Sequence, residues 1–189
     1  WAYALNKVLP RDLSVVRSST CPPGFHSRFW AKSRWYRYRI LNSPRDACRA
    51  RFVHEQPRTL DLDAMIIGAK ALRGKNDYRA FSQELDSDTN AVREVYEISL
   101  RRFRDEIWLD VTGTAFLRGM MRRMAGVLLE IGLGQRPVRH VAELLDPKAR
   151  DGLQPPVVLP ARGLCLMKIR YLRGPHTEFR PAERPNERD

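Results

Sequence analysis

Two neighbouring segments of this sequence, residues 95–101 and 106–112, alternate between apolar and polar side chains. The apolar positions are Tyr96, Ile98 and Leu100 in the first segment and Ile107, Leu109 and Val111 in the second. A period of two is typical of a strand with one buried face. Because only a short charged turn separates the two segments, we predict that they pair as an antiparallel hairpin.

The sequence before and after this hairpin predicts further strands and helices. Strands are expected at residues 13–16, 35–41 and 164–172, and helices at residues 61–73, 114–132 and from Pro137 onwards. The first residues have the composition of a helix already under way, and residues 42–57 that of a loop. In the strand at 35–41, Tyr36, Tyr38 and Ile40 share one face, and the other face holds Trp35, Arg37, Arg39 and Leu41. This strand is therefore expected to have one basic face.

The longest expected helix, residues 114–132, carries a wide apolar stripe at helical spacing. The methionines in this stripe fit a buried core better than a cofactor site. Arg118 and Arg122 are four residues apart in the sequence. We therefore predict that their guanidinium groups lie together at the edge of the buried face.

Basic residues outnumber acidic ones, with 34 Lys and Arg against 22 Asp and Glu and a formal net charge of +12. They are prominent at residues 25–40, FHSRFWAKSRWYRYRI, where arginines and a lysine are interspersed with aromatic residues. Cationic side chains bind phosphates, and aromatic rings stack on unpaired bases. We therefore expect a nucleic acid as the partner, and RNA above all. The alternative is a basic surface whose charge is merely solvated.

Composition argues against several other classes of protein. Three widely spaced cysteines without a C-x-x-C pair and four scattered histidines favour neither a disulfide framework nor a metal site. No apolar run approaches the ~20 residues that a membrane span needs. We expect a soluble protein of the cytoplasm without a membrane partner. Because residue 1 is Trp, an upstream start is expected, and an organelle reached through a removed targeting segment is the alternative.

Four segments, in order along nearly the whole chain, resemble the tRNA pseudouridine synthase I (TruA) family. They are LNKVLPRDLSV from Leu5, FHSRFWAKSRWYRYRI from Phe25, TAFLRGMMRRMAGVLLEIGLG from Thr114 and ARGLCLMKIRYL from Ala161. The second and third segments are specific to the family, whereas the first and last would be weak alone. The resemblance implies an α/β (α+β) fold over residues 1–172, with a mainly antiparallel sheet flanked by helices. Residues 173–189, which are rich in proline, are expected to form an extended tail.

The resemblance also implies a chemistry and a partner. Members of the family convert uridine in RNA to pseudouridine without cofactor or metal. They use an aspartate nucleophile, which attacks a uridine that has been turned out of the RNA. We expect tRNA as the substrate. The dimers of the family imply self-association, with membership of a larger RNA-associated complex as the alternative.

Individual residues are carried over by their place in the matching segments. Tyr36 takes the position of the tyrosine that packs on the target uracil, and Arg122 that of the arginine that pairs with the catalytic aspartate. Leu164, in the last segment, is carried over as a contact to the substrate. A cluster of RNA contacts is implied at Phe25, His26, Arg28 and Phe29, with further phosphate contacts at Arg34, Arg37 and Arg118. For Arg34 and Arg37, a role as solvated strand charges explains the sequence nearly as well.

The family's nucleophile lies in a Gly-Arg-Thr-Asp-Ala-Gly-like loop, and these 189 residues contain no such loop. Asp12, Asp46, Asp86, Asp88 and Asp110 all lack that context. One hypothesis is that the chain is the C-terminal catalytic part of a longer pseudouridine synthase. The other is an inactive relative that binds RNA or serves as a scaffold in a ribonucleoprotein or polymerase assembly. Electrostatic binding to membranes is disfavoured, because no basic amphipathic helix dominates the sequence.

Overall fold

The structure, a computed structural model, describes residues 1–86 and 88–171. Within them the chain divides into two units, residues 1–30 and Ala31–Tyr171. The expected tail, residues 173–189, lies outside the described residues. In the described part of the chain, no helix combines the length and the apolar character that are needed to cross a membrane.

The first unit begins with the short helix α1, Ala2–Asn6, where the sequence predicts a helix. The prediction of a strand at residues 13–16 is wrong. The backbone there forms hydrogen bonds with a side chain and not with another strand. Asn6 Nδ2 donates to the Val15 carbonyl oxygen at 2.9 Å, and the Val15 N–H donates to Asn6 Oδ1 at 2.7 Å. One side chain thus satisfies both backbone groups of Val15.

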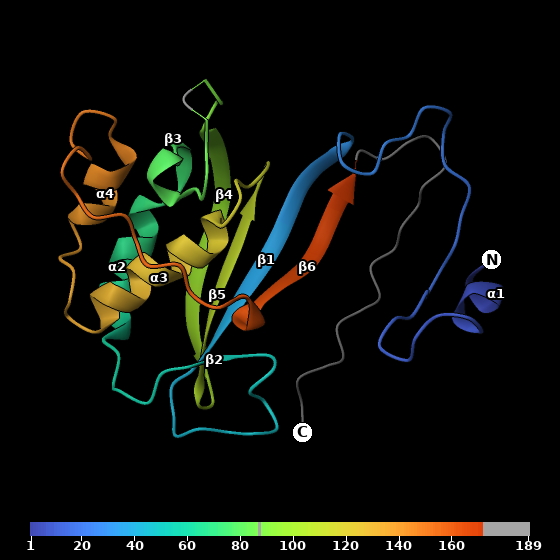
Figure 1. The fold of residues 1–189 in the computed structure, drawn as a ribbon, viewed down its shortest axis with the longest axis horizontal. Coiled ribbons are helices and arrows are strands. Elements are labelled where there is room, and N and C mark those ends of the chain that lie inside the picture. The colour runs from blue at the N-terminus through green and yellow to red at the C-terminus, as the bar shows by residue number, and fades with distance from the viewer. Residues whose placement is uncertain (87, 172–189) are drawn as a thin grey trace. The chain divides into compact units, whose positions relative to one another are not determined.

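A six-stranded sheet is the main layer of the second unit (Figure 1). Its strands are β1 (Ala31–Leu41), β2 (His54–Glu55), β3 (Gly74–Asp77), β4 (Val92–Phe103), β5 (Glu106–Gly113) and β6 (Leu164–Tyr171). The order across the sheet is β2-β1-β5-β4-β3, and β6 also pairs with β1. All pairs are antiparallel except β1 with β2. The predicted α+β fold with a mainly antiparallel sheet is confirmed.

Three helices, α2 (Leu62–Ala71), α3 (Met120–Gly132) and α4 (His140–Leu145), pack on one side of this sheet (Figure 1). Together with buried side chains of β1, β4 and β5 they enclose the hydrophobic core. Helix α2 begins where the sequence predicts, because the Asp61 carboxylate caps it by accepting from the Ala64 N–H at 2.9 Å.

Helix α3 begins at Met120, later than the sequence predicts. Gly119, which precedes it, has a φ of +76°, a left-handed conformation that glycine adopts at little cost. A Cβ at this position would also lie 2.8 Å from Gln83 Oε1. Arg118 therefore lies before the helix, so the prediction that Arg118 and Arg122 lie together at its edge is wrong.

The hairpin of β4 and β5 is antiparallel, as predicted, but an irregularity changes which side chains are buried. Val95 pairs with Gly113, and Glu97 pairs with the preceding residue of β5, which leaves Tyr96 as the extra residue of a β-bulge. As a result Val95 is 1% exposed, whereas Tyr96 is 40% exposed. The expectation that Tyr96 shares a buried face with its alternating neighbours is therefore wrong.

The basic face predicted for β1 is neutralised by acidic residues of β5. Arg37 pairs with Asp110 at 2.8 Å, and their side chains are only 12% and 16% exposed. Arg39 pairs with Glu106 at 2.7 Å. The Arg37 guanidinium also lies 4.0 Å from the ring centroid of Trp108. These arginines therefore join β1 to β5 instead of forming a solvated basic face.

Acid is expected to weaken the second unit through one cluster of ion pairs. Arg49 pairs with Asp105 at 2.6 Å and with Glu106 at 3.2 Å. Hydrogen bonds from Arg49 lower the pKa of Asp105 to about 2 from its ordinary 3.8. Burial raises the pKa of Glu106, but hydrogen bonds from Arg39 and Trp108 bring it below its ordinary 4.5. Because both carboxyl groups have a lower pKa in the folded state, their stabilisation is lost as the pH falls from about 4.5 towards 2.

We predict that Arg49→Gln lowers the urea midpoint of unfolding at neutral pH. On acidification to about pH 3, the midpoint of Arg49→Gln should then fall by less than that of the wild type. Arg58→Gln is the matched control, since among the described residues Arg58 makes hydrogen bonds only through its backbone. Equal falls of the midpoint in wild type and Arg49→Gln would contradict this account of the cluster.

Candidate active site

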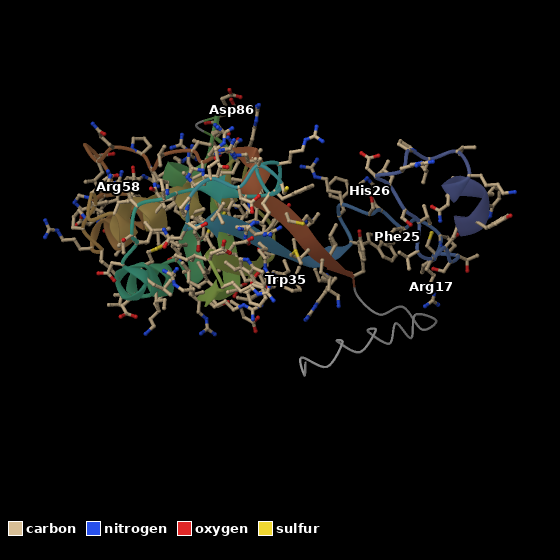
Figure 2. All side chains as sticks on the ribbon, turned by 90° about the horizontal axis from the view of Figure 1, so that it is seen from below. Arg17, Phe25, His26, Trp35, Arg58 and Asp86 are labelled. Atoms are coloured by element: carbon tan, nitrogen blue, oxygen red, sulfur yellow. The ribbon has the colours of Figure 1, made fainter. Side chains whose placement is uncertain are left out.

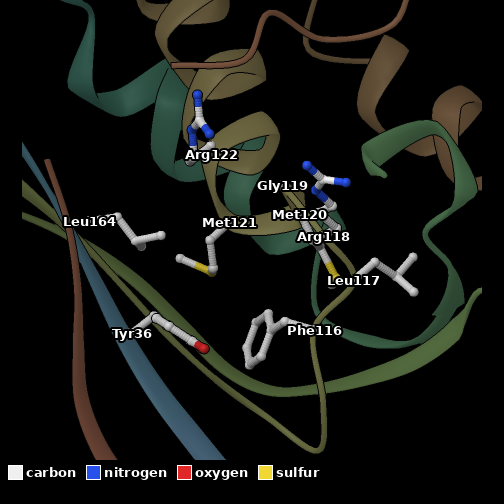
Figure 3. Close-up of a pocket in the computed structure, with 9 residues that line it drawn as sticks. All are labelled: Tyr36, Phe116, Leu117, Arg118, Gly119, Met120, Met121, Arg122 and Leu164. Carbon is white, nitrogen blue, oxygen red and sulfur yellow. The ribbon is translucent and has the colours of Figure 1, made fainter. Parts of the chain in front are cut away.

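One pocket of about 210 Å³ lies between β1, the start of β6 and the segment that leads into α3 (Figure 3). Its lining consists of Tyr36, Phe116, Leu117, Arg118, Gly119, Met120, Met121, Arg122 and Leu164. The left-handed Gly119 creates this arrangement. Gly119 follows the non-helical segment that contains Phe116, whose ring contacts Tyr36. Gly119 also caps the N-terminus of α3, the helix that carries Arg122.

Tyr36 forms one wall of the pocket. It is half-buried on β1, where it lies opposite Val111 of β5 and Leu166 of β6. Its ring meets Phe116 edge to face, with the ring centroids 5.0 Å apart and the planes at 77°. Figure 3 shows the Tyr36 hydroxyl directed toward Phe116. This pair fixes the plane of the Tyr36 ring, and a ring held in this way is suited to stacking on a base.

Arg122 forms another wall. It lies in the first turn of α3, and its Nε donates to the Leu159 carbonyl oxygen at 2.5 Å. Figure 3 shows its guanidinium turned away from Tyr36, on the far side of Met121. Among the described residues, its terminal nitrogens Nη1 and Nη2 make no hydrogen bond. A guanidinium with Nε held and two terminal donors unused is suited to binding a carboxylate.

The structure places two further predicted residues, Leu164 and Arg118, in the same pocket. Leu164 is half-buried at the start of β6. The Arg118 side chain is 73% exposed and pairs with Glu84 at 2.5 Å. An ion pair as exposed as this contributes little stability, so Arg118 can exchange Glu84 for a phosphate at low cost. Contact of either residue with a substrate stays a prediction.

The sequence does not identify five of the pocket residues as site residues: Phe116, Leu117, Gly119, Met120 and Met121. All of them lie between Thr114 and Arg122, within one of the segments that carry the family resemblance. The methionines, which the sequence predicts to be buried in the core, belong to both core and pocket. Met120 is 0% and Met121 is 3% exposed. Their place in this segment, next to Arg118 and Arg122, is the signal that could have identified these residues.

The residues predicted as an RNA-contacting cluster lie together in the first unit. His26 Nδ1 accepts from the N–H groups of Arg28 and Phe29 at 3.2 and 3.3 Å. The His26 and Phe29 rings have centroids 4.3 Å apart, and Phe29 is 74% exposed. Phe25 belongs to the same loop, as Figure 2 shows, and it contacts Trp30 edge to face. Their contact with RNA stays a prediction.

Arg34 and Arg37 are engaged in contacts within the second unit. Arg34 Nη1 donates to the Thr114 carbonyl oxygen at 2.6 Å. Arg37 forms the ion pair with Asp110 described above. Neither side chain is a simple solvated charge, and a phosphate would compete with these contacts. Their predicted role in RNA binding is therefore less favoured by the geometry than that of Arg118.

Acidic residues and metal-ligand clusters are not features of this pocket. Within residues 1–86 and 88–171, no Asp or Glu lines it. In the same part of the chain, no group of three or more His, Cys, Asp and Glu side chains is placed to hold a metal ion. The chemical groups that the pocket offers are therefore a phenol, two guanidinium groups and apolar surface.

The chain is similar in sequence to tRNA pseudouridine synthases. A family model described as tRNA pseudouridine synthase matches residues 69–172. The tRNA pseudouridine synthase A of Syntrophotalea carbinolica is 37% identical over 168 residues, which are 88% of this chain and 66% of that protein. The proteins of the same name from Moorella thermoacetica and Pseudomonas aeruginosa are 35% and 37% identical over 90% of this chain, and the match covers 69% and 60% of their lengths. The chain thus spans about two thirds of the length of these relatives.

Proposed function

The chain belongs to the tRNA pseudouridine synthase family, and from this we propose that its pocket receives a uridine of tRNA and takes part in its conversion to pseudouridine. The observation that carries the proposal is that Tyr36 and Arg122, from distant parts of the sequence, line one pocket. The names of the relatives support tRNA as the substrate. The net charge of +12 supports a polyanionic partner.

The size of the pocket favours a single base. At about 210 Å³ it is smaller than the ~300–1,000 Å³ typical of sites that enclose drug-sized ligands. A base can enter such a site only after it has left the stack of the RNA, which costs a few kcal/mol. Stacking of the base on the aromatic pair of Tyr36 and Phe116 can offset part of this cost.

The reaction is an isomerisation and requires no net oxidant or reductant. The bond from uracil N1 to C1′ of the ribose breaks, and a bond from C5 to C1′ forms. The proton on C5 then leaves, and N1 gains a proton. In our proposal the Tyr36 ring holds the uracil, and its hydroxyl takes part in the transfer of the C5 proton. Arg122 keeps a catalytic carboxylate ionised and oriented through Nη1 and Nη2.

The carboxylate itself is the part of the site that these 189 residues do not supply. None of their aspartates lies in the loop context of the family. Asp110 is paired with Arg37, and Asp46 with Arg49. We therefore propose that the nucleophile reaches the pocket from outside the 189 residues. We place the protein in the cytoplasm, with an organelle as the alternative, and we expect self-association or membership of a larger RNA-associated complex.

The test is to incubate unmodified tRNA transcripts with the product of the complete gene and, in parallel, with the 189-residue chain. Pseudouridine is then measured by mass spectrometry of nucleosides, and binding by titration at several salt concentrations. We expect the complete product to form pseudouridine. The 189-residue chain is expected to bind tRNA in a salt-dependent manner without forming it. Binding without any pseudouridine from the complete product would favour the inactive RNA-binding alternative.

A further inference from the structure

Residues 154–160, which we call the strap, cross α3 on their way from α4 to β6 (Figure 1). Their sequence, QPPVVLP, contains three prolines, which lack N–H groups and favour an extended backbone. Side chains supply the hydrogen bonds to this backbone. The acceptor carbonyls and their donors are Gln154 with Arg136 at 3.1 Å, Pro156 with Arg123 at 2.6 Å, Leu159 with Arg122 at 2.5 Å and Pro160 with Tyr38 at 2.7 Å.

The strap is also in close contact with the helix itself. A Cβ added to Gly126 of α3 would lie 2.0 Å from the Val157 carbonyl oxygen, so only glycine allows this approach. The Leu159 N–H donates to the Arg122 carbonyl oxygen at 3.4 Å. Leu159 therefore contacts Arg122 through both its N–H and its carbonyl group. The position of the strap consequently determines where Nε of Arg122 is held.

Tyr38 connects the strap to the strand that carries Tyr36. It lies two residues after Tyr36 on β1, it is 0% exposed, and it is not part of the pocket lining. Burial raises the pKa of its phenol, so the hydroxyl remains a donor at physiological pH. The proposed catalytic chemistry has no use for this buried hydroxyl. Its one hydrogen bond in the described residues goes to Pro160, next to the residue that holds Arg122.

We propose that Tyr38 is a positioning residue for Arg122 and that it acts through the strap. By holding the Pro160 carbonyl, Tyr38 fixes the adjacent Leu159 carbonyl, which holds Nε of Arg122. The terminal nitrogens of Arg122 are then presented in one direction. This inference rests on the proposed function, because that direction matters only if a carboxylate binds there. A purely structural Tyr38 would affect stability without any effect specific to Arg122.

A double-mutant cycle in the complete protein tests the proposal. Tyr38→Phe should lower the single-turnover rate of pseudouridine formation by about tenfold or more and change tRNA affinity by less than about twofold. In an Arg122→Lys background the same change should alter the rate by less than about twofold, since lysine lacks the fork that the strap aligns. An unchanged rate in Tyr38→Phe, or equal losses in both backgrounds, would overturn the proposal.

Tyr78→Phe is the matched control. Tyr78 is also 0% exposed, and its hydroxyl donates to the Leu72 carbonyl oxygen at 2.6 Å, but it is not part of the pocket lining. Both variants lose the one hydrogen bond of a buried phenol, so both should lower the melting temperature. Only Tyr38→Phe should lower the rate. A comparable loss of rate in Tyr78→Phe would attribute the effect to general destabilisation and overturn the assignment of Tyr38.

A second measurement does not depend on catalysis and so separates this inference from the proposed function. Solvent exchange of the Arg122 Nε–H, followed by NMR with isotope-labelled arginine, should be about tenfold faster in Tyr38→Phe than in wild type. Gly126→Ala, whose added Cβ would displace Val157, should have the same effect. Unchanged exchange in Tyr38→Phe overturns the inference even if the wild type forms pseudouridine. Faster exchange in a protein without activity supports the positioning contact and counts against the proposed function alone.

Discussion

Replacement of Tyr36 by alanine is expected to slow pseudouridine formation by the complete protein by about 100-fold or more under single-turnover conditions. The ring offers a stacking surface, and base stacking on an aromatic side chain is worth about 1–3 kcal/mol. The hydroxyl offers a group for proton transfer, a role that typically contributes ~10²–10⁴-fold. Tyr36→Phe retains the ring and its contact with Phe116, so it isolates the contribution of the hydroxyl.

Tyr96→Ala is the matched control for Tyr36→Ala. Tyr96 lies on β4 of the same sheet, is 40% exposed and is not part of the pocket lining. Its loss should leave the rate unchanged, because the bulge directs it away from the core. If Tyr36→Ala retained the wild-type rate while folding normally, Tyr36 would have no catalytic role.

The second large effect is expected for Arg122→Ala. Removal of one partner of a desolvated, hydrogen-bonded charge pair costs about 2–5 kcal/mol. If that cost falls on the transition state, the rate decreases by about 30-fold to 5,000-fold. The affinity for tRNA should change little, since Arg122 is one cation among the 34 Lys and Arg of a basic protein. Single-turnover rates and tRNA titrations, measured on the same preparations, provide the comparison.

Arg58→Ala serves as the control for Arg122→Ala, because Arg58 is exposed and is not part of the pocket lining. It should leave the rate unchanged. Arg122→Lys, which keeps the charge but not the planar fork, should recover only part of the lost rate. Full activity in Arg122→Ala, or a defect confined to tRNA affinity, would show that Arg122 does not orient a catalytic carboxylate.

Most elements of the second unit could be predicted from the sequence because they carry regular patterns. Alternation along β1 identified Tyr38 and Ile40 as buried residues, and both are at most 1% exposed. The cap at Asp61 identified the start of α2. The start of α3 was not predictable, since a helical pattern that contains Gly119 does not reveal the sign of its φ angle. The bulge at Tyr96 was hidden because Tyr96 is itself apolar and continues the alternation of Ile98 and Leu100. The extra residue shifts that alternation by one, so that Val95 and not Tyr96 is buried.

The candidate site was only partly predictable. Tyr36 and Arg122 were identified through the family resemblance, whereas their meeting in one pocket required the fold. The ion pair of Arg37 depends on the register that places Asp110 opposite it, and β1 alone does not contain that information. The strap could not be foreseen at all. Its hydrogen-bond acceptors are backbone carbonyl groups, which every residue has, so the sequence does not indicate them.

The most direct test of the central claim is photocrosslinking of the complete protein to tRNA in which thiouridine replaces uridine, followed by mass spectrometry of the crosslinked peptides. We expect crosslinks to the pocket, at Tyr36, Phe116 or Met121, that disappear when unmodified tRNA is added in excess. Trp108 belongs to the opposite face of the sheet, since its neighbour Leu109 is part of the core. Crosslinks on that face, with none in the pocket, would show that the pocket does not receive a uridine of tRNA.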